Sequence, residues 1–477
     1  MDPAKYHYFE ELFHPKSIAI VGASEQNALF LVPLLEANFP GKVYPVNPNR
    51  EEVYGLKCYS RILDIDGPID YVISAVPASL ALDLMKQCVE KKVKTVHYFT
   101  SGFSETGKPE DVKLEEELVR IARAGGVRII GPNCMGLYIP ESRVTYFYDF
   151  PLEGGPIALV SQSGAFAVGI VMLGRARDIR FSKVISFGNA ADLDAADFIE
   201  YLAEDPKSEV IAAYLEGVKD GRKLLGVLKD TNLRKPVIVL KGGRTSQGAR
   251  AAASHTGSLA GSANIWDAVL KQLGIITVRT VEELTDTMLA FTRVPKPPGR
   301  RILIVSFSGG SSVIQSDICT ELGLEIPVLS NESRDKISKI VPTAGTSTKN
   351  PLDIPSAYFG TDMISKTLNI AASEDSIDIV LLELLDRLPV FFKLRNAIDG
   401  YYALIENLIN SSKHVRDVLG KPFLVALPPS FYEDEGRSLK NLFQNEGFPV
   451  FPSVDRAAKA ISNVLNYYDF IEKESNV

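Results

Sequence analysis

The sequence contains few of the residues that build metal centres and disulfide frameworks. Its 477 residues include only four cysteines and five histidines. The cysteines, Cys58, Cys88, Cys134 and Cys319, lie far apart, with no Cys-x-x-Cys pair and no cluster of histidines. Zinc sites and disulfide scaffolds depend on such short spacings. We therefore expect neither, and we expect no metal ligands on this chain.

Long runs of one chemical character are also missing. No apolar run reaches the roughly 18 residues of a membrane span, so we expect no membrane segment. The opening residues, MDPAKYHYFEELF, have no basic stretch followed by an apolar one, which argues against a signal peptide. There is no long basic run and the net charge is −7, so nucleic acid is not an expected partner. A cytoplasmic protein is the expectation.

The chain does contain a regular alternation of strand and helix patterns. With 45% hydrophobic and 23% charged residues it has a globular composition, and its length suffices for about three domains. In the first third, helical stretches such as 79–91 and 112–123 separate short apolar runs. Those runs occupy residues 17–24, 42–46, 71–76, 95–99 and 127–130. The alternation predicts a parallel sheet with helices on both faces.

The middle third repeats this pattern. Strands are predicted at residues 157–160, 181–186, 210–215 and 236–240. Each is followed by a polar or glycine-rich turn, at residues 161–164, 188–189, 216–217 and 241–243. Ligands of such sheets gather at the carboxyl ends of the strands. We therefore expect all four turns on one edge of a second sheet.

A proline-rich segment, residues 294–301, marks the clearest boundary because its prolines resist helix and sheet alike. A third α/β unit then begins at Ile302, with further strands predicted at 377–382 and 422–427. The predicted fold class is α/β, with three successive parallel-sheet domains. We place them at residues 1–150, 151–294 and 302–477, with a linker at 295–301.

Two strand ends lead into helices through small residues. Residues 161–166 read SQSGAF and residues 306–312 read SFSGGSS. Open backbone N–H groups and the positive end of a helix together favour an anion such as phosphate. A plain serine N-cap explains either segment alone. Two of them in one chain favour a phosphate held between two helix starts.

A third glycine turn, IVGAS at residues 20–24, is a weaker indication of phosphate binding. The Gly-x-Gly-x-x-Gly pattern of dinucleotide-binding folds is absent, because residues 25–35 contain no glycine. The second strand ends without the acidic residue that holds a nicotinamide cofactor's ribose, and Asn49 and Arg50 there suit phosphate better. A nicotinamide dehydrogenase therefore rests on this turn alone.

His255 lies in a stretch of small residues, 241–261, which we expect to form a mobile loop because little apolar material holds it. A lone histidine is more often solvated or structural, as we expect for His7, His14, His97 and His414. His255, however, follows a predicted strand end, where the anion sites should also lie. Neutral imidazole is a good nucleophile toward phosphorus. Glu216, at a neighbouring strand end, is the best candidate to fix its tautomer.

Many of these segments match one known family. The matching residues are 13–19, 21–24, 44–48, 101–107, 131–136, 161–166, 188–192, 216–217, 254–261, 309–310 and 350–353. On these motifs the chain resembles the alpha subunit of ADP-forming acyl-CoA synthetases of the acetyl-CoA type, in the succinyl-CoA synthetase superfamily. The stretch around His255 is the most specific part of the match.

The resemblance implies a Rossmann-like CoA-binding domain followed by two flavodoxin-like ligase domains. It implies the reversible conversion of acyl-CoA, ADP and phosphate to carboxylic acid, CoA and ATP, with an acyl phosphate and a phosphohistidine as intermediates. By resemblance, His255 is phosphorylated and Glu216 steadies it. The implied phosphate-binding residues are Ser163, Gly164, Ala165, Gly309, Gly310 and Ser311. The implied CoA-binding residues are Gly22, Ala23, Ser24, Asn49, Arg50, Val76, Pro77, Thr100, Ser101 and Gly102, while Asn133 and Cys134 bind the acyl substrate.

One part of such an enzyme is missing from the sequence. We find neither an ATP-grasp region nor a Gly-x-x-x-x-Gly-Lys-Ser/Thr loop. The expected nucleotide site, with its Mg²⁺, is therefore on a separate ATP-grasp beta subunit in a hetero-oligomer. The glycine turn at residues 20–24 lacks the later glycine that the family usually has, and the nucleotide region is missing. These two departures leave one alternative open, a non-catalytic acyl-CoA-binding regulator. Residues 308–312 differ from the commoner Gly-Gly-Pro-Gly form, which leaves the acyl group open.

Overall fold

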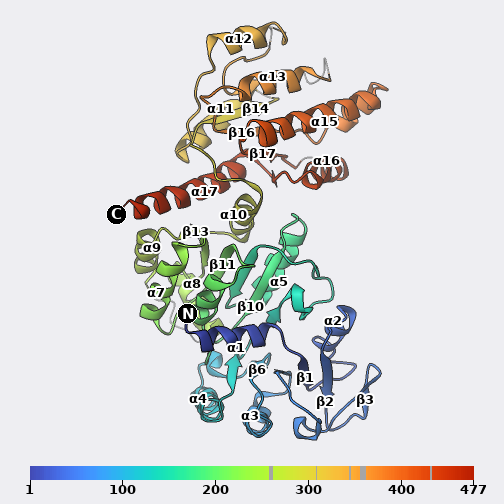
Figure 1. Cartoon of the computed structure of the whole chain (residues 1–477), viewed down its shortest axis with the longest axis vertical. Coiled ribbons are helices and arrows are strands. Elements are labelled where there is room, and N and C mark those ends of the chain that lie inside the picture. The colour runs from blue at the N-terminus through green and yellow to red at the C-terminus, as the bar shows by residue number, and fades with distance from the viewer. Residues whose placement is uncertain (257–261, 308, 343–344, 355–360, 430–431, 477) are drawn as a thin grey trace. The chain divides into compact units, whose positions relative to one another are not determined.

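The computed structural model describes the chain except residues 257–261, 308, 343–344, 355–360, 430–431 and 477, and describes residues 253–256 by their backbone alone. Contacts divide the chain into two compact units, Met1–Leu284 and Thr285–Val477 (Figure 1). They contain three largely parallel sheets, which confirms the predicted α/β class. Within the described ranges, no helix is both long and apolar enough to cross a bilayer.

The first sheet has the strand order β2-β1-β5-β6-β7, with every neighbouring pair parallel. Its strands are β1 (Ser17–Val21), β2 (Lys42–Val46), β5 (Tyr71–Ser74), β6 (Thr95–Tyr98) and β7 (Arg128–Ile130). Each one corresponds to a predicted apolar run. A small hairpin of β3 (Glu52–Val53) and β4 (Leu56–Lys57) follows β2.

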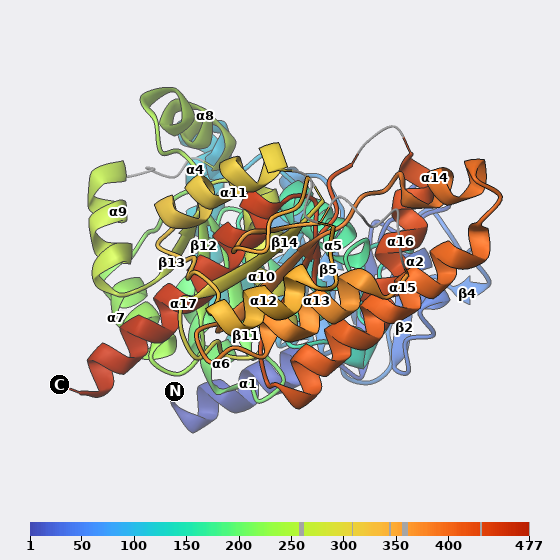
Figure 2. The same cartoon turned by 90° about the horizontal axis from the view of Figure 1, so that it is seen from above.

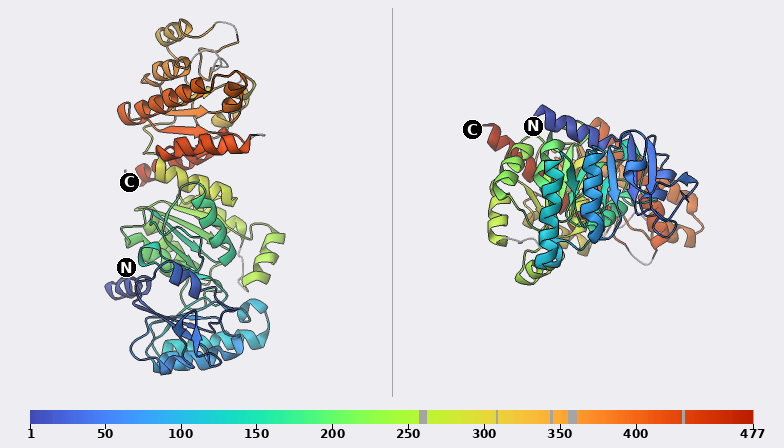
Figure 3. Two further views of the ribbon diagram at one scale, coloured as in Figure 1. Left: turned by 90° about the vertical axis from the view of Figure 1, so that its right-hand side faces the viewer. Right: turned by 90° about the horizontal axis from the view of Figure 1, so that it is seen from below.

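The helices of this region follow ordinary capping chemistry. They are α1 (Pro3–Phe13), α2 (Leu31–Glu36), α3 (Ala81–Glu90) and α4 (Pro109–Ala124). Helices α3 and α4 lie side by side (Figure 3). Helix α4 begins at a proline and has Glu110 and Asp111 in its first turn and Arg123 in its last, which complements the helix dipole.

The second sheet has the order β13-β12-β11-β9-β10-β8. Its strands are β8 (Gly136–Tyr138), β9 (Ile157–Ser161), β10 (Phe181–Ser186), β11 (Val210–Leu215), β12 (Val237–Lys241) and β13 (Ile276–Val278). Strands β9 to β12 run parallel, so the four predicted turns do share one edge. The antiparallel strand β8 was not predicted, and it pairs with β10 although it lies within residues 1–150.

Helices follow the strands of the second sheet. They are α5 (Gly164–Arg175), α6 (Ala195–Glu204), α7 (Gly221–Asn232), α8 (Ser246–Thr256) and α9 (Ala263–Gln272). Ser163, Asp194 and Asp220 cap α5, α6 and α7 by accepting hydrogen bonds from first-turn backbone N–H groups. Helices α7 and α9 lie side by side (Figure 2).

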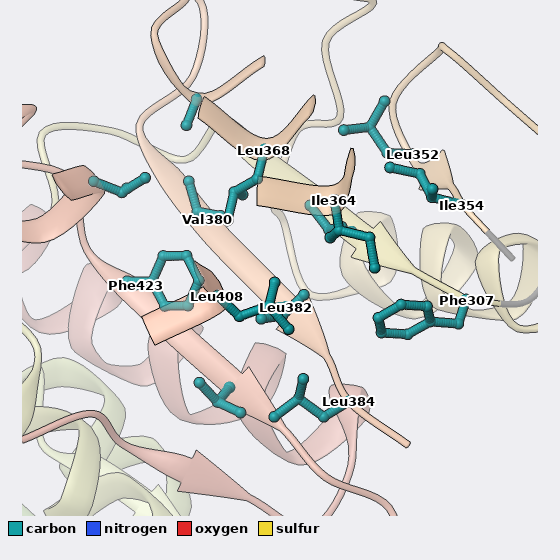
Figure 4. Packing of buried hydrophobic residues seen from close by; sticks show 14 of the residues in the cluster. Phe307, Leu352, Ile354, Ile364, Leu368, Val380, Leu382, Leu384, Leu408 and Phe423 are labelled. Atoms are coloured by element: carbon teal, nitrogen blue, oxygen red, sulfur yellow. The ribbon is translucent and has the colours of Figure 1, made fainter. Parts of the chain in front are cut away.

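The second unit contains the third sheet, with the order β15-β14-β16-β17-β18. Its strands are β14 (Ile302–Ser306), β15 (Leu352–Asp353), β16 (Ile379–Glu383), β17 (Phe423–Ala426) and β18 (Val450–Phe451). Its helices are α10 (Val281–Arg293), α11 (Gly309–Glu321), α12 (Asn331–Ser338), α13 (Met363–Ala372), α14 (Leu388–Leu394), α15 (Ile398–Lys413), the π-helix His414–Val418, α16 (Glu433–Asn445) and α17 (Val454–Ser475). The core between sheet and helices is built from aliphatic and phenylalanine side chains such as Val380, Leu382, Ile364 and Phe423 (Figure 4).

The division between the units falls at the start of α10 and not in the proline-rich segment. Asp286 and Thr287 of α10 contact α17: Arg456 Nε donates to the Asp286 carboxylate at 2.5 Å, and Asn463 Nδ2 donates to Thr287 Oγ1 at 2.9 Å. Residues 285–293 therefore pack with the second unit. The boundaries at 150, 294 and 302 remain predictions.

Candidate functional site

The clearest site lies at the point in the second sheet where the strand order changes direction. Neighbouring strands β9 and β11 pair in parallel, and the chain continues from them toward opposite edges. Ligands of open α/β sheets bind in the crevice at such a point, outside the carboxyl ends of the strands. Ser163 follows β9 and Glu216 follows β11, so two of the predicted residues meet here.

Gln162 joins the two turns. Its side-chain oxygen, in a residue only 5% exposed, accepts hydrogen bonds from the backbone N–H groups of Glu216 and of Gly217, the latter at 3.0 Å. The amide thus fixes the backbone that carries the Glu216 carboxylate. The sequence did not indicate this role, and the only available signal was the position of Gln162 between a strand and a serine cap.

Ser163 has the geometry of an N-cap. Its extended backbone starts α5, and its Oγ accepts from Phe166 N at 3.3 Å. The next residue is a glycine because a Cβ on Gly164 would lie 2.6 Å from Met135 Cγ. The first-turn N–H groups of a helix lack intrahelical partners, so the amides at Gly164 and Ala165 suit an anion. Ser163 can therefore cap the helix while the amides of Gly164 and Ala165 bind an anion.

The Glu216 carboxylate is buried and oriented. The residue is 3% exposed, and Tyr214 Oη donates to its Oε1 at 3.0 Å. The Tyr214 ring stacks on Phe166 of α5, with 4.5 Å between ring centroids and an interplanar angle of 8°. Burial and the neighbouring Glu216 charge raise the pKa of Tyr214 well above its ordinary value, so the phenol keeps its proton and remains a donor.

Lys241 supports the same turn from the adjacent strand β12. Its Nζ donates to the Glu216 carbonyl oxygen at 2.8 Å and also to the Gly242 carbonyl oxygen. The side chain is buried, and burial lowers the pKa of Lys241 to about 8, with Arg244 acting in the same direction and Glu216 opposing it. From the sequence, Lys241 was expected only within the turn after β12 and the stretch 241–261, without a role of its own.

His255 belongs to helix α8 (Ser246–Thr256). The prediction of a loop is wrong for these residues. The stretch contains four alanines between positions 249 and 253, and alanine has the highest helix propensity. Thr245 Oγ1 accepts from Gly248 N at 3.0 Å at the start of the helix. The His255 side chain and residues 257–261 lie outside the described part of the chain. The backbone of α8 lies against the 3-10 turn η3 (Ser104–Thr106) of the first sheet's region.

A second predicted site surrounds the carboxyl ends of β1 and β5, where the first sheet's strand order reverses. Gly22 has φ +92°, and a Cβ there would lie 3.1 Å from the Ala75 carbonyl oxygen. Only glycine allows the two turns to come so close. Thr100 Oγ1 donates to the Val76 carbonyl oxygen at 2.6 Å, which brings a third strand end to the same place.

The glycine turn does not feed directly into a helix. Asn27 N donates to Ser24 Oγ at 3.1 Å and closes a local turn, and α2 begins only at Leu31. The helix that we expected directly after the glycine turn therefore starts ten residues after Val21, and phosphate binding at Gly22, Ala23 and Ser24 stays a prediction. Around the turn, Ala23 is buried, Asn49 and Arg50 are exposed, and Arg50 Nε lies 3.9 Å from the Glu25 carboxylate.

The remaining predicted CoA residues lie on neighbouring turns. Pro77 starts the 3-10 turn after β5, and Ser101 is exposed after β6. Gly102 has φ +102°, and its N–H donates to the Glu105 carboxylate. Exposed backbone, Arg50 and glycines without side chains fit a phosphate-bearing ligand such as CoA.

Asn189, in the turn after β10 of the second sheet, contacts turns that follow strands of the first sheet. Its Nδ2 donates to the carboxylates of Glu105 at 2.6 Å and Glu115 at 3.0 Å, and its backbone N–H donates to the Pro132 carbonyl oxygen at 3.0 Å. Asn133, half-buried with φ +58°, places its Nδ2 3.5 Å from Asn189 Oδ1. The sequence marked Asn189 only as part of a turn after β10. The structure shows that it holds the Glu105 turn and the segment before Asn133 together.

Cys134, predicted beside Asn133, points away from the surface. The residue is 4% exposed, its Sγ lies 3.9 Å from the Tyr98 carbonyl oxygen, and burial raises its pKa well above the ordinary value. The thiol therefore stays protonated and supports the segment from inside. His97 is buried and its Nε2 contacts the Cys134 carbonyl oxygen at 2.9 Å, which agrees with a structural role.

In the second unit, α11 begins at Gly309 and Gly310. A Cβ on Gly309 would lie 2.8 Å from the Asp353 carboxylate, and Ser306 Oγ donates to the buried Glu383 carboxylate at 2.6 Å. Burial raises the pKa of Asp353. Carboxylates near a helix start stabilise the helix but repel a phosphate. The phosphate-binding role of Gly309, Gly310 and Ser311 stays a prediction.

Comparisons with known proteins match the two regions of the chain that contain these sites. Residues 16–140 match a family described as a CoA binding domain, and residues 154–291 match a succinyl-CoA ligase like flavodoxin domain. The chain is 36% identical over 468 residues to acetate–CoA ligase [ADP-forming] II subunit alpha of Pyrococcus furiosus, covering 98% of each. It is also 36% identical to acetate–CoA ligase [ADP-forming] I of Archaeoglobus fulgidus, but spans 65% of that protein's length and 98% of its own.

A solved structure shows the same likeness in three dimensions. The dinucleotide forming acetyl-coenzyme A synthetase 1 of Ca. Korarchaeum cryptofilum, in complex with phosphate and ADP, superposes with a TM-score of 0.84. The two chains are 32% identical, and the match covers 98% of this chain and 99% of the other.

Proposed function

The chain belongs to the family of alpha subunits of ADP-forming acetate–CoA ligases, and from this premise we propose that it passes a phosphoryl group through His255. It is a subunit of an ADP-forming acyl-CoA synthetase. The observation that carries the proposal is the joined pair of turns after β9 and β11. There, Gln162 precedes the capped start of α5 and accepts hydrogen bonds from the backbone N–H groups of Glu216 and Gly217. It thereby places the buried Glu216 carboxylate beside the helix start, where the strand order changes direction.

The first step makes an acyl phosphate. An oxygen of inorganic phosphate attacks the thioester carbonyl carbon, the C–S bond breaks, and CoA leaves as a thiolate that takes up a proton. Asn133 faces the thioester, and the amides of Gly164 and Ala165 with the Ser163 hydroxyl bind the phosphate. A helix start contributes about 0.3–1 kcal/mol to anion binding when exposed and up to about 2 when partly buried.

The second step transfers the phosphoryl group to the chain. A ring nitrogen of neutral His255 attacks phosphorus, and the bond to the carboxylate oxygen breaks, releasing the acid. Glu216 accepts the N–H of the other ring nitrogen, so that the attacking nitrogen keeps its lone pair. Positioning and charge stabilisation make up most of the catalytic task in such transfers.

CoA occupies the switch point of the first sheet. Its phosphates lie near Arg50, Asn49 and the turn of Gly22, Ala23 and Ser24. The turns carrying Val76, Pro77, Thr100, Ser101 and Gly102 line the rest of the ligand. Cys134 supports this segment from the interior instead of contacting substrate.

The third step needs a partner. An ADP oxygen attacks the phosphoryl group on His255 and the P–N bond breaks, giving ATP. We propose that the nucleotide and its Mg²⁺ bind an ATP-grasp beta subunit, which forms a hetero-oligomer with this chain. We also propose that Gly309, Gly310 and Ser311, at the start of α11, form the second phosphate-binding helix start. The Archaeoglobus fulgidus relative, of which this chain spans 65%, contains a further part, which supports a partner for this chain. The proposed domains are residues 1–150, 151–294 and 302–477.

Labelling tests the proposal. The chain, its beta subunit, Mg²⁺ and γ-³²P-ATP should give an acid-labile label that His255→Ala abolishes. His414→Ala serves as the matched control and should label like wild type. Undiminished label in His255→Ala would rule the proposal out.

The second candidate, a non-catalytic acyl-CoA-binding regulator, is favoured by the two carboxylates beside the start of α11. Calorimetry with acetyl-CoA, combined with a turnover assay of the two-subunit protein, separates the candidates. Binding without turnover supports the regulator, and turnover excludes it.

A further inference from the structure

Lys241 contacts three segments at once. It is the last residue of β12, it is 4% exposed, and its Nζ donates to the Glu216 and Gly242 carbonyl oxygens. The same ammonium group lies 5.2 Å from the centroid of the Trp266 ring in α9. A lysine has three N–H donors and no acceptor. Two of them serve backbone carbonyls, and a cation over an indole face is a favourable arrangement.

A second cation makes a parallel link. Arg244 Nη2 donates to the Asp267 carboxylate at 2.9 Å, one residue beyond Trp266 in α9. Arg244 and Ser246 on one side, and Ser262 and Asn264 on the other, line a cavity of about 240 Å³. The links therefore join the chain entering α8, which carries His255, to the chain that continues into α9.

We propose that Lys241 is a positioning residue for phosphoryl transfer, which holds the Glu216 turn and the first turn of α9 on one ammonium group. The inference rests on the proposed function of His255. Lys241 acts through its neighbours: it fixes the backbone that carries the Glu216 carboxylate and the helix that follows residues 246–262. The Arg244–Asp267 pair is the outer, more exposed part of the same connection.

A buried lysine that only satisfies carbonyl groups would be a simpler explanation. The chain offers a half-buried lysine that bonds to carbonyl groups for comparison. Lys235, just before β12, donates to the Leu202 carbonyl oxygen at 2.9 Å and the Asp205 carbonyl oxygen at 2.5 Å. It lies beyond the opposite end of the strand from Lys241 and serves as the matched control.

The Lys241 ammonium group should lose its proton in a pH range that experiments can cover. Burial lowers its pKa to about 8, and the charged groups that face it are Glu216, which opposes the shift, Arg244, which adds to it, and Asp267 beyond Arg244. The Tyr214 phenol nearby keeps its proton in this range. The ammonium contact with Trp266 is therefore complete well below pH 8, half lost near pH 8 and lost well above it.

The fluorescence of Trp266 reports this contact directly, because it is the only tryptophan in the chain. Wild-type protein, excited beyond tyrosine absorption, should show one emission transition with a midpoint near pH 8. Lys241→Met and Lys241→Arg should lack the transition, and Lys235→Met should keep it. A transition that persists in Lys241→Met, or is absent from wild type, overturns the assignment.

Transfer kinetics test the positioning role in the two-subunit enzyme. A misplacement of about 1 Å can cost about 10²-fold in rate. We expect Lys241→Met to slow labelling of His255 by γ-³²P-ATP at least about tenfold, with the KM for CoA little changed. Lys241→Arg, which keeps the cation, should restore most of the rate, and Lys235→Met should label like wild type.

An unchanged labelling rate in Lys241→Met, or an equal loss in Lys235→Met, contradicts the positioning role. The two hypotheses fail differently. If the His255→Ala variant is still labelled, the proposed function fails, whatever the fluorescence of Trp266 shows. If His255→Ala abolishes label while Lys241→Met transfers normally, only the role of Lys241 fails.

Discussion

At the scale of single residues, Glu216 depends on Tyr214, two residues before it, and on Gln162 and Lys241, which lie far from it in the sequence. Gln162 and Lys241 hold its backbone, and Tyr214 holds its carboxylate. These partners come from three strand ends, because parallel strands bring their carboxyl ends to one edge. The position of Glu216 and Ser163 after apolar strands was predictable. The support from Gln162 and Lys241 was not predictable, because sequence spacing gives no cross-strand register.

Glu216→Gln should slow phosphohistidine formation by roughly 10²-fold or more, because the amide keeps the shape but loses the charge that stabilises and orients a histidine. Thermal unfolding of the variant should stay close to that of wild type. Rapid-quench labelling with γ-³²P-ATP and the beta subunit measures the effect. A rate equal to that of wild type would remove Glu216 from the mechanism.

His97 should make the protein sensitive to acid. Burial lowers its pKa from 6.5 to about 4, so the unfolded chain takes up the proton first as pH falls. Its contribution to stability is complete above pH 6.5 and is lost as pH falls toward 4, by up to about 3 kcal/mol. Urea unfolding from pH 7 to 4 should show this loss in wild type and not in His97→Gln. Parallel curves for the two proteins would contradict the prediction.

At the scale of elements, close packing of turns decides which small residues are required. Gly188 has φ +50°, and a Cβ there would lie 2.2 Å from the Pro132 carbonyl oxygen. Gly226, exposed in the middle of α7, would meet nothing within 4 Å. The two glycines therefore form a matched pair, one required by its surroundings and one not.

Gly188→Ala should destabilise the protein by about 1–3 kcal/mol, because backbone atoms must move. Gly226→Ala should stabilise it by about 0.5–1 kcal/mol, because alanine favours the helix. Equilibrium urea denaturation measures both differences. Equal effects of the two changes would contradict the packing described around the turn after β10.

The strands were the most predictable elements. Runs such as 210–215 and 302–306 are apolar throughout, as buried parallel strands require. Short strands such as β8 escaped prediction because three residues carry too little pattern and β8 pairs antiparallel at the sheet edge. Helix α8 was predicted as a loop because small residues suggested mobility, whereas its alanines favour a helix.

At the scale of the whole molecule, the three successive sheets followed from the alternation of strand and helix along the chain. The division into two compact units could not be predicted from the sequence, because the contact of α10 with α17 joins residues that are distant in sequence. The proposed need for a beta subunit also belongs to this scale. We propose that this chain carries the phosphorylated histidine and that the nucleotide binds elsewhere.

The most direct test of the account is a single-turnover chase of the isolated, ³²P-labelled chain. With acetate and CoA, and without nucleotide or beta subunit, label should leave His255 as inorganic phosphate while an equal amount of acetyl-CoA forms. Acetate is the probe because the family's acetate–CoA ligases use it by name. Label that remains on the chain while acetyl-CoA accumulates would show that the phosphoryl group does not pass through His255.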